Sequence, residues 1–445
     1  MRLRRFSLLL WLTLFWVVAA SAVAQEANPV IEVKPGGLTA YRVALQQFAA
    51  VGPEVDAART AGLRDIMRRG LEFTSSIVTL PDAAFLGPVV SLLGQGSTAP
   101  DCAEWRASGA DVLVAGAVAS RDGVVQIEVH VWDVARCLRL ATERYSRTAA
   151  EFDWSARRIA DDIVGAITGN PGAFATEIAF ITVRGRESQV ALMNADGSNV
   201  RPATSGNSIK VFPDWLPEGG GILYTAFVTG KQPSLFVTSR SPAVKAGGLL
   251  SGVLPDRPKY RGVFSPSGDS LALVSSVDGS AELYRVARTG RKLRRLTFSP
   301  SIEVSPTWSP DGRKIAFVSD RSGSPQVFVM NADGTGKRRL TFQGYYNSSP
   351  AWSPDGRWIV YQTRLEAQFD IWLIDPTGEV NFPIVEHPRS DESPSWSPDG
   401  RRIVFSSTRR GPADLYSVDR SGEGLRRLTR GAGHNRYPAW GPYPR

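Results

Sequence analysis

The stretch SPTWSPDGRKIAFVSD, residues 305–320, returns almost letter for letter as SPAWSPDGRWIVYQT at 349–363 and SPSWSPDGRRIVFSS at 393–407. Alignment on the aromatic residue gives six positions, the first two 49 residues apart and the others 44 apart: Trp215, Phe264, Trp308, Trp352, Trp396 and Trp440. A fixed period of this size is typical of a solenoid or a propeller.

Each copy contains several short strands. In the copy at 305–342, KIAFVS (314–319), QVFVMNADG (326–334) and KRRLTF (337–342) follow the aromatic segment. The first two are short, rich in β-branched and aromatic residues, and bounded by turn formers, as strands are. With the aromatic segment itself this makes four strands per copy, which favours a propeller blade over a solenoid unit.

The residues that recur in each copy have folding roles. The proline two residues before the aromatic is expected to set the start of the innermost strand, because proline cannot continue a ladder. The tryptophan is expected to pack between neighbouring blades, and Asp-Gly to supply the positive φ angles of a tight hairpin. Asp311, Asp355 and Asp399 are therefore interpreted as turn residues, not as catalytic carboxylates or calcium ligands.

The two ends of the repeat region complement each other. Only five residues follow Trp440, whereas residues 176–205 contain the later strands of a blade without its aromatic start. Joining them completes a blade and removes free edges, so the sequence predicts an all-β, six-bladed β-propeller over 176–445. Two copies depart from the pattern, one with Gly262 and Phe264 and one with VNFPIVEH at 380–387. We expect irregular surface at both.

The N-terminus has the pattern of a secretory signal. A basic start, an apolar run from Phe6 to Ala20 and the small residues of SAVA predict a leader at 1–24, cleaved between Ala24 and Gln25. A membrane anchor is the alternative, but the run is shorter than the roughly 20 residues that a spanning helix needs. Residues 25–38 would then form a mobile N-terminal segment of an exported protein.

Residues 39–170 carry no copy of the repeat and predict a small α/β domain. We expect a strand at 41–49, a helix at 56–73, a hairpin over 110–134, a third strand at 138–145 and a helix at 154–169. That last helix would end at Gly169, a favourable position after a helix C-terminus. Residues 171–175 would link this domain to the propeller.

Composition and charge are those of an ordinary globular chain of 445 residues, 42% apolar and 21% charged. The formal charge of +9 falls to +6 when the three arginines of the leader are removed. Basic residues are scattered without aromatic interleaving, which disfavours a nucleic-acid partner. The two cysteines, Cys102 and Cys137, could form a disulfide in an oxidising compartment or remain as buried thiols, and the sequence leaves both open.

Several segments together resemble one family. The leader, GADVLVAGAV (109–118), VHVWDV (129–134), ARRIADDIVGAITGNPGAFATEIAFI (156–181) and the ring of WSPDG copies are similar to the TolB family of the Tol–Pal system in Gram-negative bacteria. The resemblance implies a non-catalytic periplasmic protein without cofactors. Its implied partners are the peptidoglycan-associated lipoprotein Pal, the inner-membrane protein TolA and further outer-membrane proteins. The implied roles are outer-membrane integrity and constriction during cell division.

The resemblance also implies a partner-binding surface, here named the mouth, in loops just before each repeat aromatic. The mouth residues are Tyr260, Arg261, Glu303, Val304, Ser305, Tyr346, Asn347, Ser348, Ser349, Asp391, Glu392, His434, Asn435 and Arg436. A ring brings such loops around one concavity. The family's N-terminal signalling segment, which links to TolA, would include Val30, Ile31 and Val33.

The sequence also bears on two other classes of function, an enzyme and a propeller that binds a small molecule or a glycan. An enzyme is disfavoured because the chain has no G-x-S-x-G elbow, no H-E-x-x-H and no dinucleotide or Walker glycine loop. Its three histidines, His130, His387 and His434, lie far apart in sequence, and His130 is interpreted as a structural residue within a strand. A periplasmic propeller that binds a small molecule or a glycan stays open as the alternative.

Overall fold

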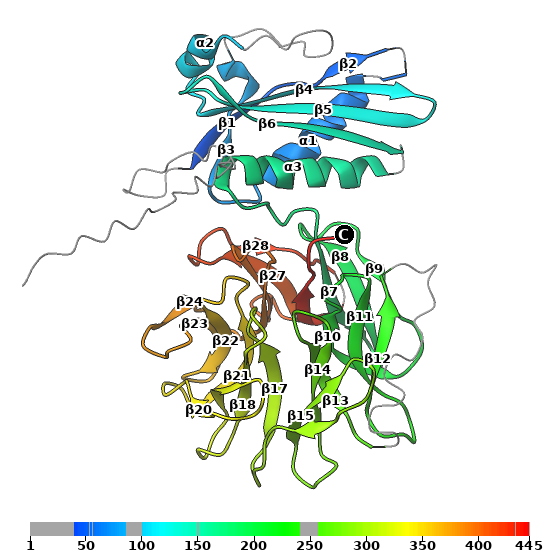
Figure 1. Cartoon of the computed structure of the whole chain (residues 1–445), viewed down its shortest axis with the longest axis vertical. Coiled ribbons are helices and arrows are strands. Elements are labelled where there is room, and N and C mark those ends of the chain that lie inside the picture. The colour runs from blue at the N-terminus through cyan, green and yellow to red at the C-terminus, as the bar shows by residue number, and fades with distance from the viewer. Residues whose placement is uncertain are drawn as a thin grey trace, which may run out of the picture.

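The computed structural model describes residues 40–52, 54–55, 57–85, 100–148, 151–240, 257–431 and 433–444. An α/β unit lies over one end of a β-propeller (Figure 1). The predicted cleavage site at Ala24 and Gln25, and the segment 25–38 with Val30, Ile31 and Val33, lie outside the described residues.

The α/β unit is built on one mixed sheet. Its elements are β1 (Tyr41–Leu45), β2 (Ala49–Val51), α1 (Ala57–Leu71), β3 (Ile77–Thr79), a 3₁₀ turn (Asp82–Ala84), α2 (Cys102–Ala107), β4 (Val112–Arg121), β5 (Val124–Asp133), β6 (Leu138–Thr148) and α3 (Phe152–Thr168). The sheet order is β3-β1-β4-β5-β6, with β2 also paired to β4. β1 runs parallel to β3 and β4, while β4, β5 and β6 form an antiparallel meander. Helices α1 and α3 lie on the side of the sheet that faces the propeller (Figure 1).

Most elements of this unit were predicted. The second long helix ends at Gly169 as expected, where φ is 82° and the backbone N–H donates to the carbonyl oxygen of Gly165. The single strand expected at 41–49 is two strands, β1 and β2. β2, β3 and α2 were missed because three or six residues are too few for a periodic pattern. Non-local and capping contacts hold α2 instead: the Asp101 carboxylate caps its N-terminus, and a disulfide joins Cys102 to Cys137 with the Cα atoms 5.7 Å apart.

The propeller consists of six blades, numbered I to VI along the chain. Blade I contains β10 (Ile209–Trp215), β11 (Gly221–Phe227) and β12 (Ser234–Ser239); blade II contains β13 (Tyr260–Phe264), β14 (Ser270–Ser275), β15 (Glu282–Ala287) and β16 (Arg294–Arg295). Blade III contains β17 (Glu303–Trp308), β18 (Lys314–Ser319), β19 (Gln326–Asn331) and β20 (Arg338–Arg339); blade IV contains β21 (Tyr346–Trp352), β22 (Ile359–Arg364), β23 (Asp370–Ile374) and β24 (Asn381–Val385). Blade V contains β25 (Asp391–Trp396), β26 (Arg402–Ser407), β27 (Asp414–Asp419) and β28 (Arg426–Arg427).

Blade VI closes the ring with strands from both ends of the repeat region, as predicted. Its order is β29 (His434–Trp440), β7 (Glu177–Arg184), β8 (Glu187–Asn194) and β9 (Arg201–Pro202). β29 pairs antiparallel with β7, for example Trp440 with Ile178. The last blade is therefore joined by backbone hydrogen bonds between residues more than 250 positions apart in the chain.

The repeat tryptophans pack between blades, which confirms their predicted role. The indole N–H of Trp308 donates to the carbonyl oxygen of Val263 in the preceding blade, at 3.2 Å, and that of Trp396 donates to Ala351 at 3.1 Å. Trp308 also belongs to one hydrophobic cluster with Ala272 of blade II. Each of these buried indoles thus donates its N–H to a hydrogen bond while its ring packs between two blades.

The Asp-Gly turns differ from the expectation in one respect. Gly312 alone has a positive φ, 69°, while Asp311 does not. The Asp311 carboxylate instead accepts a hydrogen bond from the hydroxyl of Ser309 and another, at 3.0 Å, from the backbone N–H of Arg313. This carboxylate closes its own turn, in agreement with the interpretation as a folding residue.

Of the two departures from the repeat, the first is not irregular surface, whereas the second contains an irregularity: the pairing of its strand with β23 shifts register between Ile371 and Trp372, and Phe382 is exposed. Gly262 lies in β13, where an added Cβ would come within 2.9 Å of the Leu235 side chain and 3.1 Å of that of Leu223. Phe264 is as buried as the tryptophans that it replaces. The segment at 380–387 forms β24, a five-residue outer strand where the other described outer strands have two residues.

The α/β unit contacts the propeller through the Asp-Gly end of the blades. A guanidinium N–H of Arg402 donates to the backbone carbonyl of Phe73 at 3.2 Å, and one of Arg401 donates to the hydroxyl of Thr168 at 2.6 Å. Because the innermost strands end at these turns, they begin at the opposite end of the propeller, which the α/β unit leaves open. The mouth residues are at that open end.

Candidate functional site

The innermost strand of every blade is interrupted at the same place. Three residues before each repeat aromatic, a non-glycine residue has a left-handed backbone with φ between 46° and 58°. These six residues, here named the bulge ring, are Phe212, Arg261, Ser305, Ser349, Ser393 and Tyr437. The pairing with the second strand shifts register at each of them, as at a β-bulge.

This bulge corrects the predicted role of the repeat prolines. The prolines lie inside the innermost strands, one residue after the bulge, and do not mark the strand starts. Strand β17, for example, begins at Glu303, three residues before Pro306. Proline is tolerated there because the bulge has already broken the ladder.

The predicted loop location of the mouth is also wrong. All fourteen residues lie in the innermost strands, at their open ends: Tyr260, Arg261, Glu303, Val304, Ser305, Tyr346, Asn347, Ser348, Ser349, Asp391, Glu392, His434, Asn435 and Arg436. Apart from the bulge residues Arg261, Ser305 and Ser349, these polar residues pair regularly with the second strand, although they lack the usual composition of a strand.

Three mouth side chains are fully buried and form hydrogen bonds within the protein, although the second carboxylate oxygen of Glu303 and the amide oxygen of Asn347 have no partner among the described residues. The Glu303 carboxylate accepts hydrogen bonds from the Ser319 hydroxyl at 2.7 Å and the Arg321 guanidinium at 2.8 Å. In the same structural position, Asp391 forms an ion pair with Arg409 at 3.0 Å. The Asn347 amide donates to the side chain of Gln326 at 2.8 Å and to the carbonyl oxygen of Gln343 at 2.7 Å. Glu303, Asn347 and Asp391 thus stabilise the blades and are not free to contact a partner.

Other mouth residues are accessible. Tyr346 is 39% exposed, and its ring packs edge-on against Phe369 with the ring centroids 5.4 Å apart. His434 and Arg436 are exposed at the start of β29. Val304, Ser305, Ser348 and Glu392 line a cavity of about 310 Å³ that opens at the mouth.

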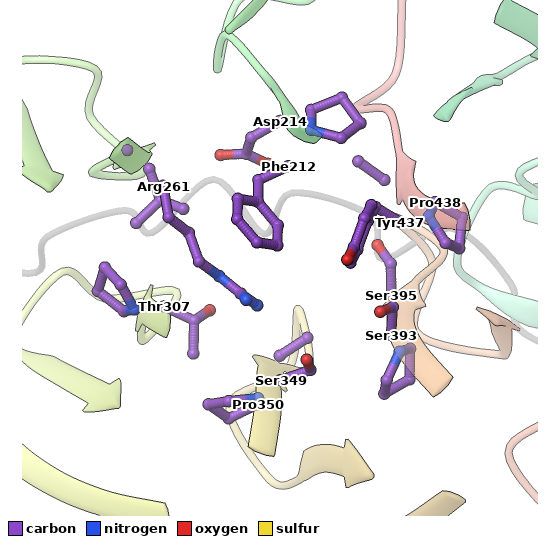
Figure 2. Close-up of a pocket in the computed structure, with 17 residues that line it drawn as sticks. Phe212, Asp214, Arg261, Thr307, Ser349, Pro350, Ser393, Ser395, Tyr437 and Pro438 are labelled. Atoms are coloured by element: carbon purple, nitrogen blue, oxygen red, sulfur yellow. The ribbon is translucent and has the colours of Figure 1, made fainter. Parts of the chain in front are cut away.

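The bulge ring lines this cavity with aromatic and charged side chains on one side and with serines on the other. On one side, Tyr437 packs edge-on against Phe212 at 4.8 Å between ring centroids, and the Arg261 guanidinium lies over the Phe212 ring at 4.7 Å. On the other side the ring consists of the three serines. A second, smaller cavity of about 130 Å³ lies at this level and is lined by both sides of the ring, and Figure 2 shows the labelled side chains converging on it.

The two cavities together are here named the channel. Burial shifts the pKa values of the charged groups that line it. Burial raises the pKa of Asp214 to about 7, although the charge of Arg261 opposes that shift. Burial lowers the pKa of Arg261 to about 10, so that its guanidinium remains charged at neutral pH. Burial also raises the pKa of Glu392, against the opposing effect of Arg436.

Sequence reasoning missed Phe212, Asp214, Ser393 and Tyr437, which line the channel beside the predicted residues. The signal was present in the repeat alignment, because the position three residues before each aromatic points into the channel in every blade. The residue at that position is a phenylalanine, an arginine, a serine or a tyrosine, whereas the next position is proline in five of the six copies.

The structure does not gather the histidines into a reactive site. His130 is 2% exposed in β5, where its ring nitrogens contact Glu128 at 2.9 Å and Thr142 at 3.1 Å, as expected of a structural histidine. Across the described ranges, no three His, Cys, Asp or Glu side chains come together as metal ligands would. Nor does any helix in those ranges combine the length and apolarity needed to cross a membrane.

Comparison with known proteins places this architecture. The solved structure of TolB from Acinetobacter baumannii superposes with a TM-score of 0.75 over 91% of this chain and 97% of that one, at 22% identity, which shows the shared fold. Among curated relatives, the Tol-Pal system protein TolB of Anaeromyxobacter dehalogenans strain 2CP-C is 35% identical over 66% of this chain and 65% of its own length. That of Desulfosudis oleivorans is 32% identical over 61% of this chain and 59% of its own. The matched region therefore spans less than two thirds of either relative.

Family-level matches cover both parts of the chain. Residues 29–140 match the TolB amino-terminal domain, and residues 164–444 match the TolB beta propeller domain. The second match alone covers more than half of the sequence and includes all six blades, with the bulge ring. The chain belongs to the TolB family.

Proposed function

We propose that this protein is the non-catalytic, periplasmic protein-binding component of its Tol–Pal system, that it binds Pal at the mouth, and that its N-terminal segment links it to TolA. In this account it supports outer-membrane integrity and constriction during division. Family membership supports the Tol–Pal assignment, and the leader pattern at 1–24 supports the periplasm.

The single observation that carries the Pal assignment is the open end of the propeller. There, exposed Tyr346 lines a cavity and exposed His434 and Arg436 lie at the same end, while the opposite end is covered by the α/β unit. An accessible tyrosine and arginine around a concavity are residue types enriched at protein–protein contacts.

Calorimetric titration of the mature chain, residues 25–445, with the soluble domain of Pal from the same organism tests the proposal. Glu303→Ala is unsuitable as a probe, because it would remove a buried carboxylate, leave Arg321 without its ion-pair partner and change the blade itself. We therefore choose the double variant Tyr346→Ala, Arg436→Ala. Its matched control is Phe236→Ala, Arg291→Ala, which removes an exposed aromatic and an exposed arginine away from the mouth.

We expect one-to-one binding by the parent chain and by the control, and at least about tenfold weaker binding by the mouth variant. A chain that lacks residues 25–38 should still bind Pal but no longer bind TolA. Absence of Pal binding in an assay independent of heat would refute the Pal assignment. Saturable binding of a small molecule or a glycan at the same cavity would then be the better interpretation.

A further inference from the structure

Arg261 is a half-buried cation that forms no ion pair in the described part of the chain, although the charge of Asp214 acts on it. Its backbone N–H donates to the Thr225 hydroxyl at 2.9 Å, but in the described part of the chain its guanidinium forms no hydrogen bond or ion pair. The guanidinium lies over the face of the Phe212 ring, 4.7 Å from its centroid. Arg409, by contrast, lies at the same end of the propeller and forms an ion pair with Asp391. A desolvated charge costs free energy unless a counter-charge compensates it.

The neighbouring part of the bulge ring offers further donors. Ser305, Ser349 and Ser393 face the channel, and in the described structure none of their hydroxyls is engaged in a hydrogen bond. Figure 2 shows the Arg261 side chain extending toward the centre of the channel, with Phe212 on one side and Thr307 and Ser349 on the other. The guanidinium and the serine hydroxyls therefore border the same cavity.

The acidic groups around the cavity limit the charge of its ligand. Asp214 lies at the level of the ring, and Glu392 and Asp320 line the cavity nearer the mouth. Burial raises the pKa of Asp214 to about 7 and also raises that of Glu392, so both are more readily protonated than exposed carboxylates. One guanidinium among such groups matches a single negative charge better than a phosphate dianion.

We propose that Arg261 binds a carboxylate in the propeller channel, with the hydroxyls of Ser349 and Ser393 as supporting donors, and that an acidic side chain of the protein at the mouth supplies it. A planar guanidinium pairs with a carboxylate through two parallel hydrogen bonds. The source of the carboxylate rests on the proposed function, because the cavity opens at the mouth. The site itself rests on the unpaired guanidinium.

The first test compares the affinity of four chains for the soluble Pal domain. Arg261→Gln removes the charge, Arg261→Lys keeps the charge without the planar fork, and Arg389→Gln removes an exposed charge at the same end of the propeller as a matched control. We expect the dissociation constant to rise about tenfold or more for Arg261→Gln. The dissociation constant of Arg261→Lys should lie between those of the parent chain and of Arg261→Gln. Arg389→Gln should change the dissociation constant by less than about threefold. Thermal melting verifies that each variant is folded.

The second test probes the site without a protein partner. The side-chain Nε–H resonance of Arg261, identified by its loss in Arg261→Lys, is followed by NMR while sodium propionate, sodium chloride or sodium phosphate is added at equal ionic strength. We expect propionate alone to shift it in a saturable manner. An equal shift with phosphate would overturn the preference for a carboxylate.

The two tests separate this inference from the proposed function. If Pal binds the parent chain and Arg261→Gln equally well, and propionate has no effect, the carboxylate site is wrong and the Pal assignment stands. If Pal fails to bind but propionate shifts the resonance, the site stands, and its carboxylate comes from a free small molecule and not from a protein.

Discussion

At the scale of single residues, Asp161 fixes the connection between the two parts of the molecule. It lies on α3, is 1% exposed, and accepts hydrogen bonds at 2.8 Å from the backbone N–H groups of Phe174 and Ala175. Its own backbone carbonyl accepts from Gly172 at 3.0 Å. The segment that leads into the propeller is therefore held against α3 by one side chain.

The buried Asp161 carboxyl predicts a pH dependence of stability. Burial raises its pKa to about 7, against the opposing effect of the two backbone N–H groups, whereas an unfolded aspartate has a pKa near 3.9. Between these values the folded protein holds a proton that the unfolded chain releases, so the free energy of unfolding falls as the pH rises from about 4 to about 7.

Urea unfolding of the parent chain and of Asp161→Asn across this range measures the effect. The parent should lose stability relative to the variant as the pH rises. Asp153→Asn, an exposed change on the same helix, should show no such trend. A constant difference between the parent and Asp161→Asn at all pH values would mean that Asp161 does not titrate in this window.

Residue chemistry also explains what the sequence could not predict at the mouth. Glu303 and Asp391 have the composition of a solvated loop, yet both are buried. Their partners, Arg321 and Arg409, come from the hairpin between the second and third strands, 18 residues further along in each case. Such a pairing depends on the packed blade, so the letters around Glu303 or Asp391 do not reveal it.

At the scale of elements, the repeat pattern predicted the number of blades and their closure because each of its letters has a local folding role. The bulge was not predictable in the same way. Strand β21, for example, pairs through Tyr346, Asn347 and Ser348, shifts register, and resumes at Ala351. The left-handed residue between is a serine, which carries no general preference for that conformation.

The bulge predicts opposite effects of glycine at two neighbouring positions. Ser349 has φ of 50°, so Ser349→Gly should leave stability unchanged or raise it by about 1 kcal/mol, and Ser349→Val should lower it by about 1–2 kcal/mol. Ser348 has an ordinary strand backbone, so Ser348→Gly should cost about 0.5–1 kcal/mol. Urea unfolding measures all three. A larger loss for glycine at 349 than at 348 would contradict the bulge.

At the scale of the whole molecule, the α/β unit and the propeller share a buried core. Phe73, which follows α1, packs against the Phe174 and Trp440 rings at 5.6 and 6.2 Å between centroids, and the guanidinium groups of Arg402 and Arg426 lie over it at 4.9 and 5.6 Å. This contact covers the Asp-Gly end of the propeller near blades V and VI. The end covered by the α/β unit and the open end are thus distinct. The repeat alone could not predict this difference, because the blades share one sequence pattern.

Because the two ends of the propeller differ in this way, we expect a protein to bind at the open end. Hydrogen–deuterium exchange of the mature chain, with and without the soluble Pal domain, tests it most directly. We predict slower exchange at the starts of β21, β25 and β29, residues 346–349, 391–393 and 434–437, with the outer strands β20 and β28 unchanged. Protection confined to the outer strands or to the α/β unit would contradict the claim.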